Sequence, residues 1–323
     1  MKRKVAIVTG CAGFLGSHFT RRLLKDGWRV YGIDRISYCS NDEVIKEFSS
    51  YKEERFKFNQ IDICDLVRLP EADVVFHLAA ESHVTNSIAN SNSFINSNIT
   101  GTYKLLELLR SIPKEIRPLF FHVSTDEVFG DIKEGFFTED SVLKPSNPYA
   151  ASKVAAEAFV KSWHRTYGIE YFIIRPTNMY GKDQYPEKLI PLTIKNLDND
   201  KKIRLHNNGV PTRTWLHVED CVDAMLTIYT KSGKNQTYNC SGNIEQSNYE
   251  TVYKIVKEYL EGTRKDPSEF MASNIDYSYN RPGQDIRYAI NDFKLRSLGW
   301  LPTKSFDTEI SKIIKYETCR NRW

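Results

Sequence analysis

The sequence has 323 residues, of which 41% are hydrophobic and 27% charged, and its formal net charge is +4. This composition is typical of a globular protein with one large domain or two smaller ones. It contains no basic block of the kind that binds nucleic acid, no signal-peptide pattern and no run of 18 apolar residues that could cross a membrane. The six cysteines form no C-x-x-C pair, so we expect reduced thiols, no metal site and a cytoplasmic location.

The first predicted element is a buried strand over residues 4–8, which runs directly into a turn with the glycine spacing G-x-x-G-x-x-G. Apolar residues then recur every four positions and predict a helix that ends near Gly27. A strand, a glycine turn and a helix N-terminus together cradle a phosphate group, because glycine lets backbone N–H groups approach it. We therefore predict that a dinucleotide binds at Gly10, Gly13, Phe14, Leu15 and Gly16.

The second predicted strand, over residues 29–33, ends in Asp34. Its distance from the glycines is that of a carboxylate that binds the adenosine ribose of NAD and repels the 2′-phosphate of NADP. Arg35 follows and weakens that preference, and an ordinary turn residue is the alternative interpretation of Asp34. A third strand lies within residues 55–63, and the predicted adenine contacts at its end are Asp62 and Ile63.

A fourth predicted strand, over residues 73–77, leads into a turn of small residues that would let a cofactor lie against the strand end. The predicted cofactor contacts in this turn are Leu78, Ala79, Ala80 and Ser82. His83 follows. A lone histidine in a loop is more often structural, so we predict a ligand contact there and no catalytic role. A long helix is then expected over residues 92–111, in which Asn98 is either a cofactor contact or a solvent-exposed side chain.

Residues 119–153 hold the groups that a proton-coupled redox reaction needs. A buried strand predicted over residues 119–123 is followed by the polar residues Thr125, Asp126 and Glu127. Tyr149 and Lys153 then lie one turn apart on one face of a predicted helix. A neighbouring ammonium and a cationic cofactor ring favour the phenolate, so this pair can act as a base at neutral pH. Such a pair is more often a surface ring and a solvated amine, but the preceding glycine turn favours catalysis.

Strands and helices alternate through the first half, which predicts an α/β protein with a Rossmann-type, doubly wound parallel sheet. A further strand over residues 171–176 is followed by a region rich in proline and glycine. We therefore predict a NAD-binding domain over residues 1–178, to which 215–242 return, and a smaller C-terminal domain formed by 179–214 and 243–323.

Two arginines of the second half lie in segments that look compact and rich in turns, Arg213 within residues 213–220 and Arg281 within residues 280–285. Arginine forks suit diphosphates, although a single arginine more often forms a surface salt bridge. In a chain that already has a dinucleotide site, these arginines together with Lys188 indicate a second ligand that carries phosphate.

Six motifs, in order along nearly the whole chain, resemble the extended short-chain dehydrogenase/reductase family and, within it, the dTDP-glucose 4,6-dehydratase branch. They are residues 9–16, 79–84, 124–130, 148–153, 186–191 and 281–283. This resemblance implies a nucleotide-sugar 4,6-dehydratase with NAD in the Rossmann domain, a nucleotide sugar in the smaller C-terminal domain, and a homodimer. It also implies the substrate contacts His83, Thr125, Asn178, Lys188, Leu189, Arg204, His206, Arg213, Asn248 and Arg281.

The same resemblance implies a role for each residue of the catalytic group. Tyr149 takes the proton from the sugar O4 while C4 gives a hydride to NAD, with Thr125 hydrogen-bonded to the same oxygen and Lys153 tuning the phenol. Glu127 then removes the C5 proton, and Asp126, held protonated, donates to the departing O6. Two adjacent carboxyl groups in different protonation states distinguish this reaction from 4-epimerisation. The alternative is a solvated acidic turn.

The predicted pocket for the nucleobase departs from the pattern of this branch. Arg204 and His206 stand where the branch usually has a proline and a tyrosine against the thymine, and Gln284 replaces a common histidine. These changes leave UDP-N-acetylglucosamine, UDP-glucose and dTDP-glucose as candidate substrates and favour a UDP sugar. A nucleotide-sugar 4-epimerase or decarboxylase, and a non-catalytic NAD-binding regulator, are the other classes that the sequence leaves open.

Overall fold

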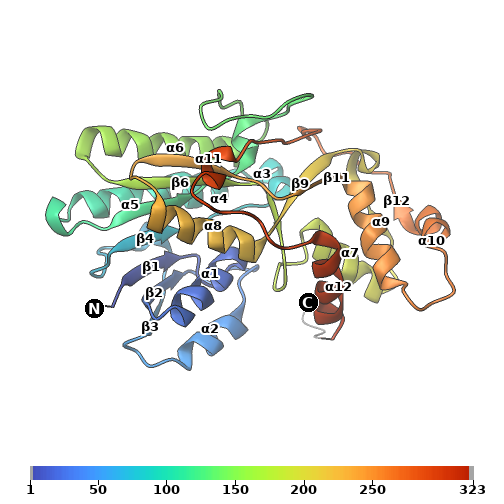
Figure 1. Cartoon of the computed structure of the whole chain (residues 1–323), viewed down its shortest axis with the longest axis horizontal. Helices are drawn as coiled ribbons and strands as arrows, with labels where there is room; N and C mark the ends of the chain where they lie inside the picture. The colour runs from blue at the N-terminus through green and yellow to red at the C-terminus, as the bar shows by residue number, and fades with distance from the viewer. Residues whose placement is uncertain (1–2, 320–323) are drawn as a thin grey trace.

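A seven-stranded parallel sheet forms the centre of the protein in the computed structural model, which describes residues 3–319 (Figure 1). The strands are β1 (Val5–Thr9), β2 (Arg29–Asp34), β3 (Phe56–Gln60), β4 (Val74–His77), β5 (Leu119–Val123), β6 (Tyr171–Pro176) and β10 (Gln236–Cys240). They lie in the order β10-β6-β5-β4-β1-β2-β3. The predicted Rossmann-type fold is confirmed, and all six strands predicted from the sequence are present.

Helices cover both faces of the sheet, because side chains alternate along each strand and both sets are apolar. Ala6 and Val8 of β1 pack into the core of one face, whereas Ile7 packs into the core of the other. The helices of the first face are α1 (Phe14–Lys25), α2 (Asp42–Ser49) and α8 (Val218–Lys231), and those of the second are α5 (Gly101–Arg110) and α6 (Pro148–Tyr167). Burial on both faces explains why inner strands such as β1, β4 and β5 are nearly continuous apolar runs, whereas the edge strand β3 carries exposed polar residues.

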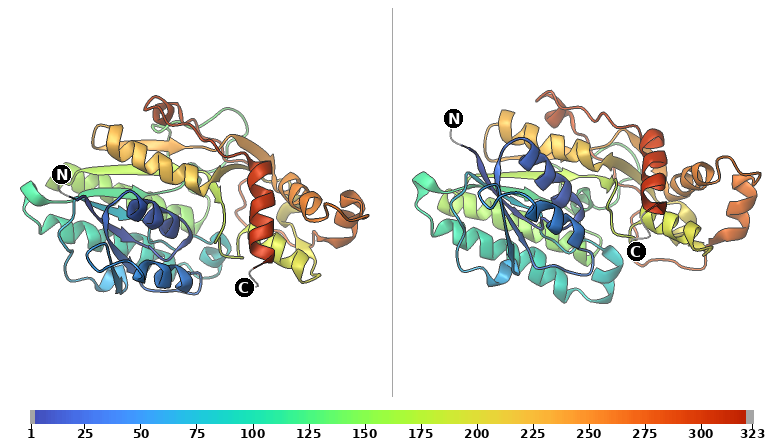
Figure 2. Two further views of the ribbon diagram at one scale, coloured as in Figure 1. Left: turned by 60° about the horizontal axis from the view of Figure 1, so that its bottom comes forward. Right: turned by 90° about the horizontal axis from the view of Figure 1, so that it is seen from below.

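A second hydrophobic core lies beyond the sheet, on the right in Figure 1 and in both views of Figure 2. Its helices are α7 (Leu189–Asp198), α9 (Asn248–Tyr259), α10 (Pro267–Asn274) and α12 (Phe306–Thr318). Two small sheets accompany them, one made of β7 (Asn178–Tyr180), β9 (Thr212–His217) and β11 (Ile244–Ser247), the other of β8 (Ile203–Arg204) and β12 (Ile275–Asp276).

The chain passes between the two cores more than once. β10 returns to the large sheet and pairs with β6, in keeping with the expected return of residues 215–242. Leu295 and Trp300, in and after α11 (Phe293–Arg296), are also buried in the core of the large sheet. The predicted boundary had assigned residues 243–323 as a whole to the C-terminal domain. We keep the two-domain division as a proposal and assign α11 to the NAD-binding side.

Two predicted segments differ from the structure. The helix expected over residues 92–111 contains a π-helical turn, Ile95–Thr100, between α4 (Asn92–Phe94) and α5. Such turns often occur at functional sites. Arg213 lies in β9, which leads directly into α8, and not in a turn-rich segment. Trp215 of β9 pairs with β7 and β11, and local sequence carries no information on such long-range pairing.

Shorter helical elements connect these layers, namely α3 (Val84–Ala89) and the 3₁₀ turns η1 (Ile63–Asp65), η3 (Lys114–Ile116), η4 (Asp126–Phe129) and η5 (His206–Gly209). Within residues 3–319, no helix combines the length and the apolar character needed to cross a membrane. The cysteines are free thiols, as predicted, and Cys11 of the glycine turn is buried in the core.

Candidate active site

A continuous cleft crosses the carboxyl ends of the sheet strands and continues into the second core. Three adjoining hollows form it. The first and second hollows share Gly10 and Gly13, and the second and third share Glu127, Asn178 and Lys188. Ligands of parallel α/β sheets bind at this edge, because the loops that follow the strands meet there. The cleft is therefore the candidate active site.

Every site residue predicted from the sequence lines this cleft, with the exception of Asn98. Asn98 is buried behind the wall, where its Oδ1 accepts a hydrogen bond from the Glu81 N–H at 2.9 Å. Its Nδ2 donates to the Glu81 carbonyl at 3.0 Å and to the Ser152 Oγ at 2.8 Å. Asn98 is thus neither a solvent-exposed side chain nor part of the cleft surface. A buried amide needs such partners, and here they fasten the loop that carries Glu81 to α6.

The glycine turn after β1 is packed so closely that Gly10 and Gly16 leave no space for a side chain. A Cβ atom on Gly16 would lie 1.9 Å from the Gly10 carbonyl oxygen, and one on Gly10 would lie 2.8 Å from the Ala79 Cα. Gly10 also has a φ of +72°, which L-residues rarely adopt. Gly13 begins α1 without a capping side chain, so the N-terminal N–H groups of the helix are available to an anion. This turn fits the pyrophosphate of a dinucleotide.

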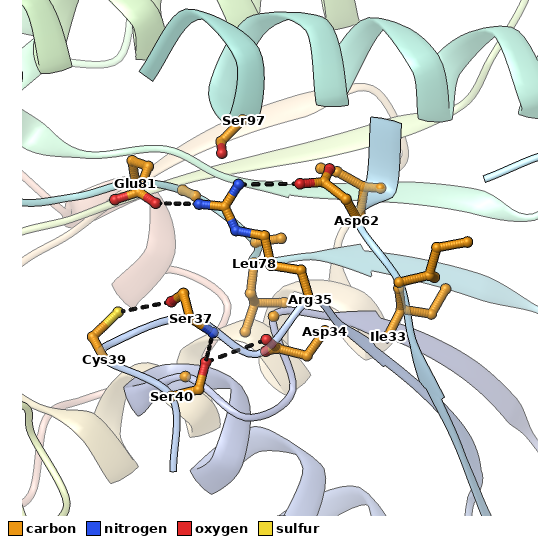
Figure 3. Close-up of a pocket in the computed structure, with 16 residues that line it drawn as sticks. Ile33, Asp34, Arg35, Ser37, Cys39, Ser40, Asp62, Leu78, Glu81 and Ser97 are labelled. Carbon is orange, nitrogen blue, oxygen red and sulfur yellow. Dashed lines mark hydrogen bonds and ion pairs between the residues drawn. The ribbon is translucent and has the colours of Figure 1, made fainter. Parts of the chain in front are cut away.

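The first hollow holds the predicted adenosine contacts (Figure 3). The buried Asp34 carboxylate accepts hydrogen bonds from the backbone N–H groups of Ala12 at 3.0 Å and Ile36 at 2.8 Å. Burial raises the pKa of Asp34, and these hydrogen bonds oppose the rise. The other predicted contacts in this hollow are Asp62, Ile63, Leu78, Ala79 and Ala80. A fixed carboxylate beside a phosphate cradle fits the ribose of a dinucleotide.

The catalytic candidates come from two elements and meet in the second hollow. Thr125 precedes η4, and its Oγ1 accepts a hydrogen bond from the Glu127 N–H at 3.3 Å and donates one to Asp126 Oδ1 at 3.2 Å. Tyr149 and Lys153 lie in the first two turns of α6. The parallel pairing of β5 with its neighbours places both elements at the same edge of the sheet. All five residues predicted to be catalytic therefore face one space.

Tyr149 and Lys153 are both buried, and the lysine is directed at the backbone of β5. Its Nζ donates to the Val123 carbonyl at 2.7 Å, and burial lowers the pKa of Lys153 to about 8. Burial also raises the pKa of Tyr149, and the negative charge of Glu127 adds to the rise. We expected Lys153, together with a cationic cofactor ring, to lower the Tyr149 pKa. The lysine alone does not produce this effect, because desolvation of the phenolate is larger.

Asp126 and Glu127 occupy different environments although they are adjacent. Asp126 is 3% exposed, and burial together with the charge of Glu127 raises its pKa to about 7. The Asp126 Oδ2 has no hydrogen-bond partner in the part of the chain that the structure describes. Glu127 lies where the second and third hollows join, with its Oε2 accepting a hydrogen bond from Asn147 Nδ2 at 3.4 Å. One carboxyl group is suited to donate a proton near pH 7, and the other faces the cleft.

Two residues that the sequence analysis missed complete the carboxylate cluster from the C-terminal region. The Tyr288 Oη lies 3.2 Å from Glu127 Oε2 and 2.5 Å from Asp285 Oδ2. A single O–H cannot donate to both carboxylates at once, so these three groups compete for one proton. Arg213 lies over the Tyr288 ring, 4.3 Å from its centroid. The motif at residues 281–283 pointed to this region, but local sequence gives no signal for Tyr288.

The third hollow gathers the predicted substrate contacts. Lys188 Nζ donates to the Ser82 carbonyl at 2.9 Å and so joins the start of α7 to the loop after β4. The Arg281 Nε and the His206 Nδ1 are buried without hydrogen-bond partners among residues 3–319. Buried polar groups are normally paired, so these atoms are suited to a polar ligand. The remaining predicted contacts in the same hollow are His83, Asn178, Leu189, Arg204, Arg213 and Asn248.

Arg213 has a more structural environment than we predicted. Its Nη1 donates to the carbonyls of Thr212 at 2.7 Å and Ile286 at 3.3 Å, and its Nη2 donates to the Asp285 carbonyl at 3.0 Å. These bonds tie β9 to the segment that carries Tyr288. Part of the guanidinium still lines the third hollow. Arg213 therefore holds the site together in addition to any contact with a ligand.

Residues 7–313 match the family model described as GDP-mannose 4,6 dehydratase. The dTDP-glucose 4,6-dehydratase of Escherichia coli is 37% identical over 343 residues, which cover 98% of this chain and 94% of that protein. The dTDP-glucose 4,6-dehydratase of Neisseria meningitidis is 37% identical, with coverage of 99% and 95%.

Solved structures show the same similarity. A dTDP-glucose 4,6-dehydratase from Streptomyces venezuelae, crystallised with NAD bound, is 32% identical with a TM-score of 0.89, and the match covers 99% of this chain and 98% of that one. A UDP-glucuronic acid 4-epimerase from Bacillus cereus, solved with UDP-glucuronic acid and NAD, is 25% identical with a TM-score of 0.88 and covers 98% and 99% of the two chains. The resemblance predicted from the six motifs is confirmed, and the chain belongs to the GDP-mannose 4,6 dehydratase family.

Proposed function

We propose that the chain is an NAD-dependent nucleotide-sugar 4,6-dehydratase, a lyase that converts an NDP-hexose to the NDP-4-keto-6-deoxyhexose with loss of water. The observation that carries this proposal is the buried Asp126, with its pKa raised to about 7, next to Glu127 and in one hollow with Tyr149 and Lys153. Elimination of water needs an acid and a base in addition to the residues that act at C4, whereas 4-epimerisation does not. The names of the relatives support the same reaction.

The first half of the proposed reaction takes place at C4 and O4. NAD, held by the glycine turn and Asp34, would supply the hydride-transfer chemistry at C4 and C6. Tyr149 takes the proton from O4, and Thr125, which lines the same hollow, hydrogen-bonds to that sugar oxygen and holds it in place. Lys153, with a pKa of about 8, carries a positive charge at neutral pH and stabilises the developing phenolate.

The second half removes water between C5 and C6. A ketone at C4 acidifies the C5 hydrogen, and Glu127 takes that proton while Asp126 protonates the departing O6. The carbon–oxygen bond at C6 breaks, and the electron pair of the C5–H bond forms the C5–C6 double bond. When the hydride is returned to C6, the electron pair of this double bond takes the proton back from Glu127 at C5, which gives the 4-keto-6-deoxy sugar. Burial of Asp126 keeps a large share of it protonated near pH 7, which an exposed aspartate would not be.

We propose a UDP sugar as the substrate, with UDP-glucose and UDP-N-acetylglucosamine as the candidates. At the far end of the cleft, the His206 ring lies 4.9 Å from the Tyr279 ring, and Arg204 lies 5.7 Å from the centroid of the same ring. This wall is polar and cationic, whereas the methyl group of thymine favours an apolar contact. Uracil lacks that methyl group. The dTDP-glucose named for the relatives is the competing candidate.

We also propose that the protein is a homodimer. Tyr103 of α5 and Tyr167 of α6 are exposed, as is Ile95 of the adjoining π-helical turn. Neighbouring exposed apolar side chains of this size mark interaction surfaces, and a two-fold axis would bury both copies of this patch.

Sedimentation should show a dimer that Tyr103→Asp weakens, because the substitution buries an unpaired charge. A monomer at all concentrations would contradict the proposal.

The products formed from a substrate panel test the reaction and the nucleobase together. With NAD-loaded enzyme, we expect UDP-glucose or UDP-N-acetylglucosamine to lose one water faster than dTDP-glucose does. No net reduced cofactor should accumulate, because the hydride taken from C4 returns to C6. Mass spectrometry of the sugar and absorbance of the cofactor measure the two quantities. Stoichiometric reduced cofactor would indicate a simple dehydrogenase, and a product that keeps O6 would indicate an epimerase.

Replacing Tyr149 by phenylalanine tests the step at O4. The Tyr149→Phe variant keeps the ring and removes the hydroxyl, so oxidation at C4 should fall by about 10²- to 10⁴-fold, the usual contribution of a positioned base. Single-turnover measurement of cofactor reduction gives the rate of oxidation at C4. Tyr51→Phe, which removes a hydroxyl from an exposed ring, serves as the control and should leave the rate unchanged. Retention of most activity by Tyr149→Phe would show that another group acts at O4.

Replacing each carboxyl group by its amide separates the two halves of the reaction. Glu127→Gln should still oxidise C4 but exchange the C5 hydrogen with solvent very slowly. Asp126→Asn should oxidise C4 and exchange C5, yet expel water about 10²- to 10⁴-fold more slowly, because an amide is not an acid. Deuterium incorporation at C5 in D₂O, followed by mass spectrometry, distinguishes these outcomes.

The pH dependence of the elimination step is a second test of the proposed role of Asp126 as the acid. Its acid form is lost as the pH rises through about 7, so the elimination step should slow above that pH. The slow residual step in Asp126→Asn should lack this dependence. Asp140→Asn, an exposed change in the loop before α6, is the matched control. Dehydration at the unaltered rate in both Asp126→Asn and Glu127→Gln would favour the epimerase alternative.

A further inference from the structure

Arg35 lies at the adenosine end of the cleft, directly after Asp34. An arginine at this place commonly accommodates the 2′-phosphate of NADP. In this protein its guanidinium turns away from Asp34 and lies between Asp62 and Glu81 (Figure 3). Its Nη1 donates to Asp62 Oδ2 at 3.1 Å, and its Nη2 donates to Glu81 Oε1.

Both partners of Arg35 are held by the backbone around them. The second oxygen of Asp62, Oδ1, accepts a hydrogen bond from the Cys64 N–H at 2.9 Å. The backbone N–H and carbonyl of Glu81 are both bound to the buried amide of Asn98, at 2.9 and 3.0 Å. Paired charges on anchored residues bind more strongly than a mobile surface pair does. The guanidinium is therefore fixed on both sides, with each η nitrogen bound to a carboxylate.

The charges that line the first hollow also disfavour a 2′-phosphate. Its lining residues include three carboxylates, those of Asp34, Asp62 and Glu81, against the guanidinium of Arg35. A 2′-phosphate would bring about two further negative charges into this space. NAD has a neutral 2′-hydroxyl at that position, and this hydroxyl can donate a hydrogen bond to the Asp34 carboxylate.

We propose that Asp62 and Glu81 determine the cofactor preference of this protein by sequestering Arg35, so that the arginine cannot serve a 2′-phosphate. The inference rests on the proposed function only for the class of the cofactor. In this proposal the buried Asn98 also has a role, because its amide positions Glu81. It also explains how a chain with arginine after the ribose carboxylate selects NAD.

Binding of the two dinucleotides to nucleotide-free protein tests this proposal without turnover. Isothermal titration with NAD and with NADP gives the ratio of the two dissociation constants, and we expect the unaltered protein to favour NAD at least tenfold. In the double variant Asp62→Asn, Glu81→Gln, the ratio should shift at least tenfold towards NADP, which corresponds to about 1.4 kcal/mol. The two ligands differ only in the 2′-phosphate, so a general structural defect would not move their ratio.

A third substitution shows whether the shift depends on Arg35. Adding Arg35→Gln to the double variant should abolish the gain in NADP affinity, because the released guanidinium is then missing. If the gain persists without Arg35, removal of negative charge explains it and the proposal is wrong. An unchanged ratio in the double variant would also overturn it.

The exposed Asp65 provides the matched control. Asp65→Asn removes a carboxylate three residues from Asp62 but outside the lining of this hollow, and it should leave the ratio unchanged. An equal shift in Asp65→Asn would overturn the proposal, since it would point to general charge effects. If neither dinucleotide bound the unaltered protein, the cofactor class in the proposed function would fail together with this inference. Binding with the expected ratios but no dehydration would instead fault the proposed reaction alone.

Discussion

The parallel register of the central sheet is the constraint on which the whole site depends. β1, β4, β5 and β6 run in one direction, so the residues that follow them, from Gly10 to Thr177, emerge at one edge. The close contact between Gly10 and Gly16 presses α1 onto that edge and leaves no space for a side chain. Backbone hydrogen bonds and backbone packing thus fix the phosphate cradle beside the acid–base group. Few of these constraints come from side chains that a single substitution could remove.

Burial shifts the pKa values of the residues proposed as the acid–base group. Asp126 and Lys153 are each 3% exposed, and in both the charged form loses solvation, so the pKa of the acid rises and the pKa of the base falls. Both values move towards neutrality, where one group can donate a proton and the other can change charge at little cost. Burial is the largest cause of both shifts, although each residue also has a hydrogen-bond partner, Thr125 for Asp126 and the Val123 carbonyl for Lys153. Tyr149 shows the limit of the effect, because burial alone moves its pKa away from neutrality.

Most of the fold and much of the candidate site could be predicted from the sequence, because both are encoded in short patterns. Most of the predicted strands are apolar runs. The glycine spacing follows one of them directly, Asp34 ends another, and Tyr149 and Lys153 lie one turn apart in a helix that the sequence also predicts. The features that were missed depend on contacts between distant residues. Nothing near Arg35 indicates that it meets both Asp62 and Glu81, and nothing near Tyr288 indicates that it reaches Glu127 across the fold. Asn98 looked exposed or ligand-facing for the same reason, since its partner Ser152 lies 54 positions away.

The two cores contribute different parts of the candidate site, one for the proposed reaction and the other for the proposed nucleobase contacts. The acid–base residues follow strands of the large sheet or begin α6, whereas Arg204, His206 and Arg281 come from strands and loops around the second core. Seven residues at the junction, among them Glu127 and Lys188, line both the second and the third hollow. Arg204 and His206 line only the third hollow, so under the proposed function a change at either residue would alter the proposed base pocket while the sheet edge keeps its geometry. The similarity to known dehydratases therefore supports the proposed reaction at the sheet edge, whereas the proposed nucleobase rests on side chains around the second core.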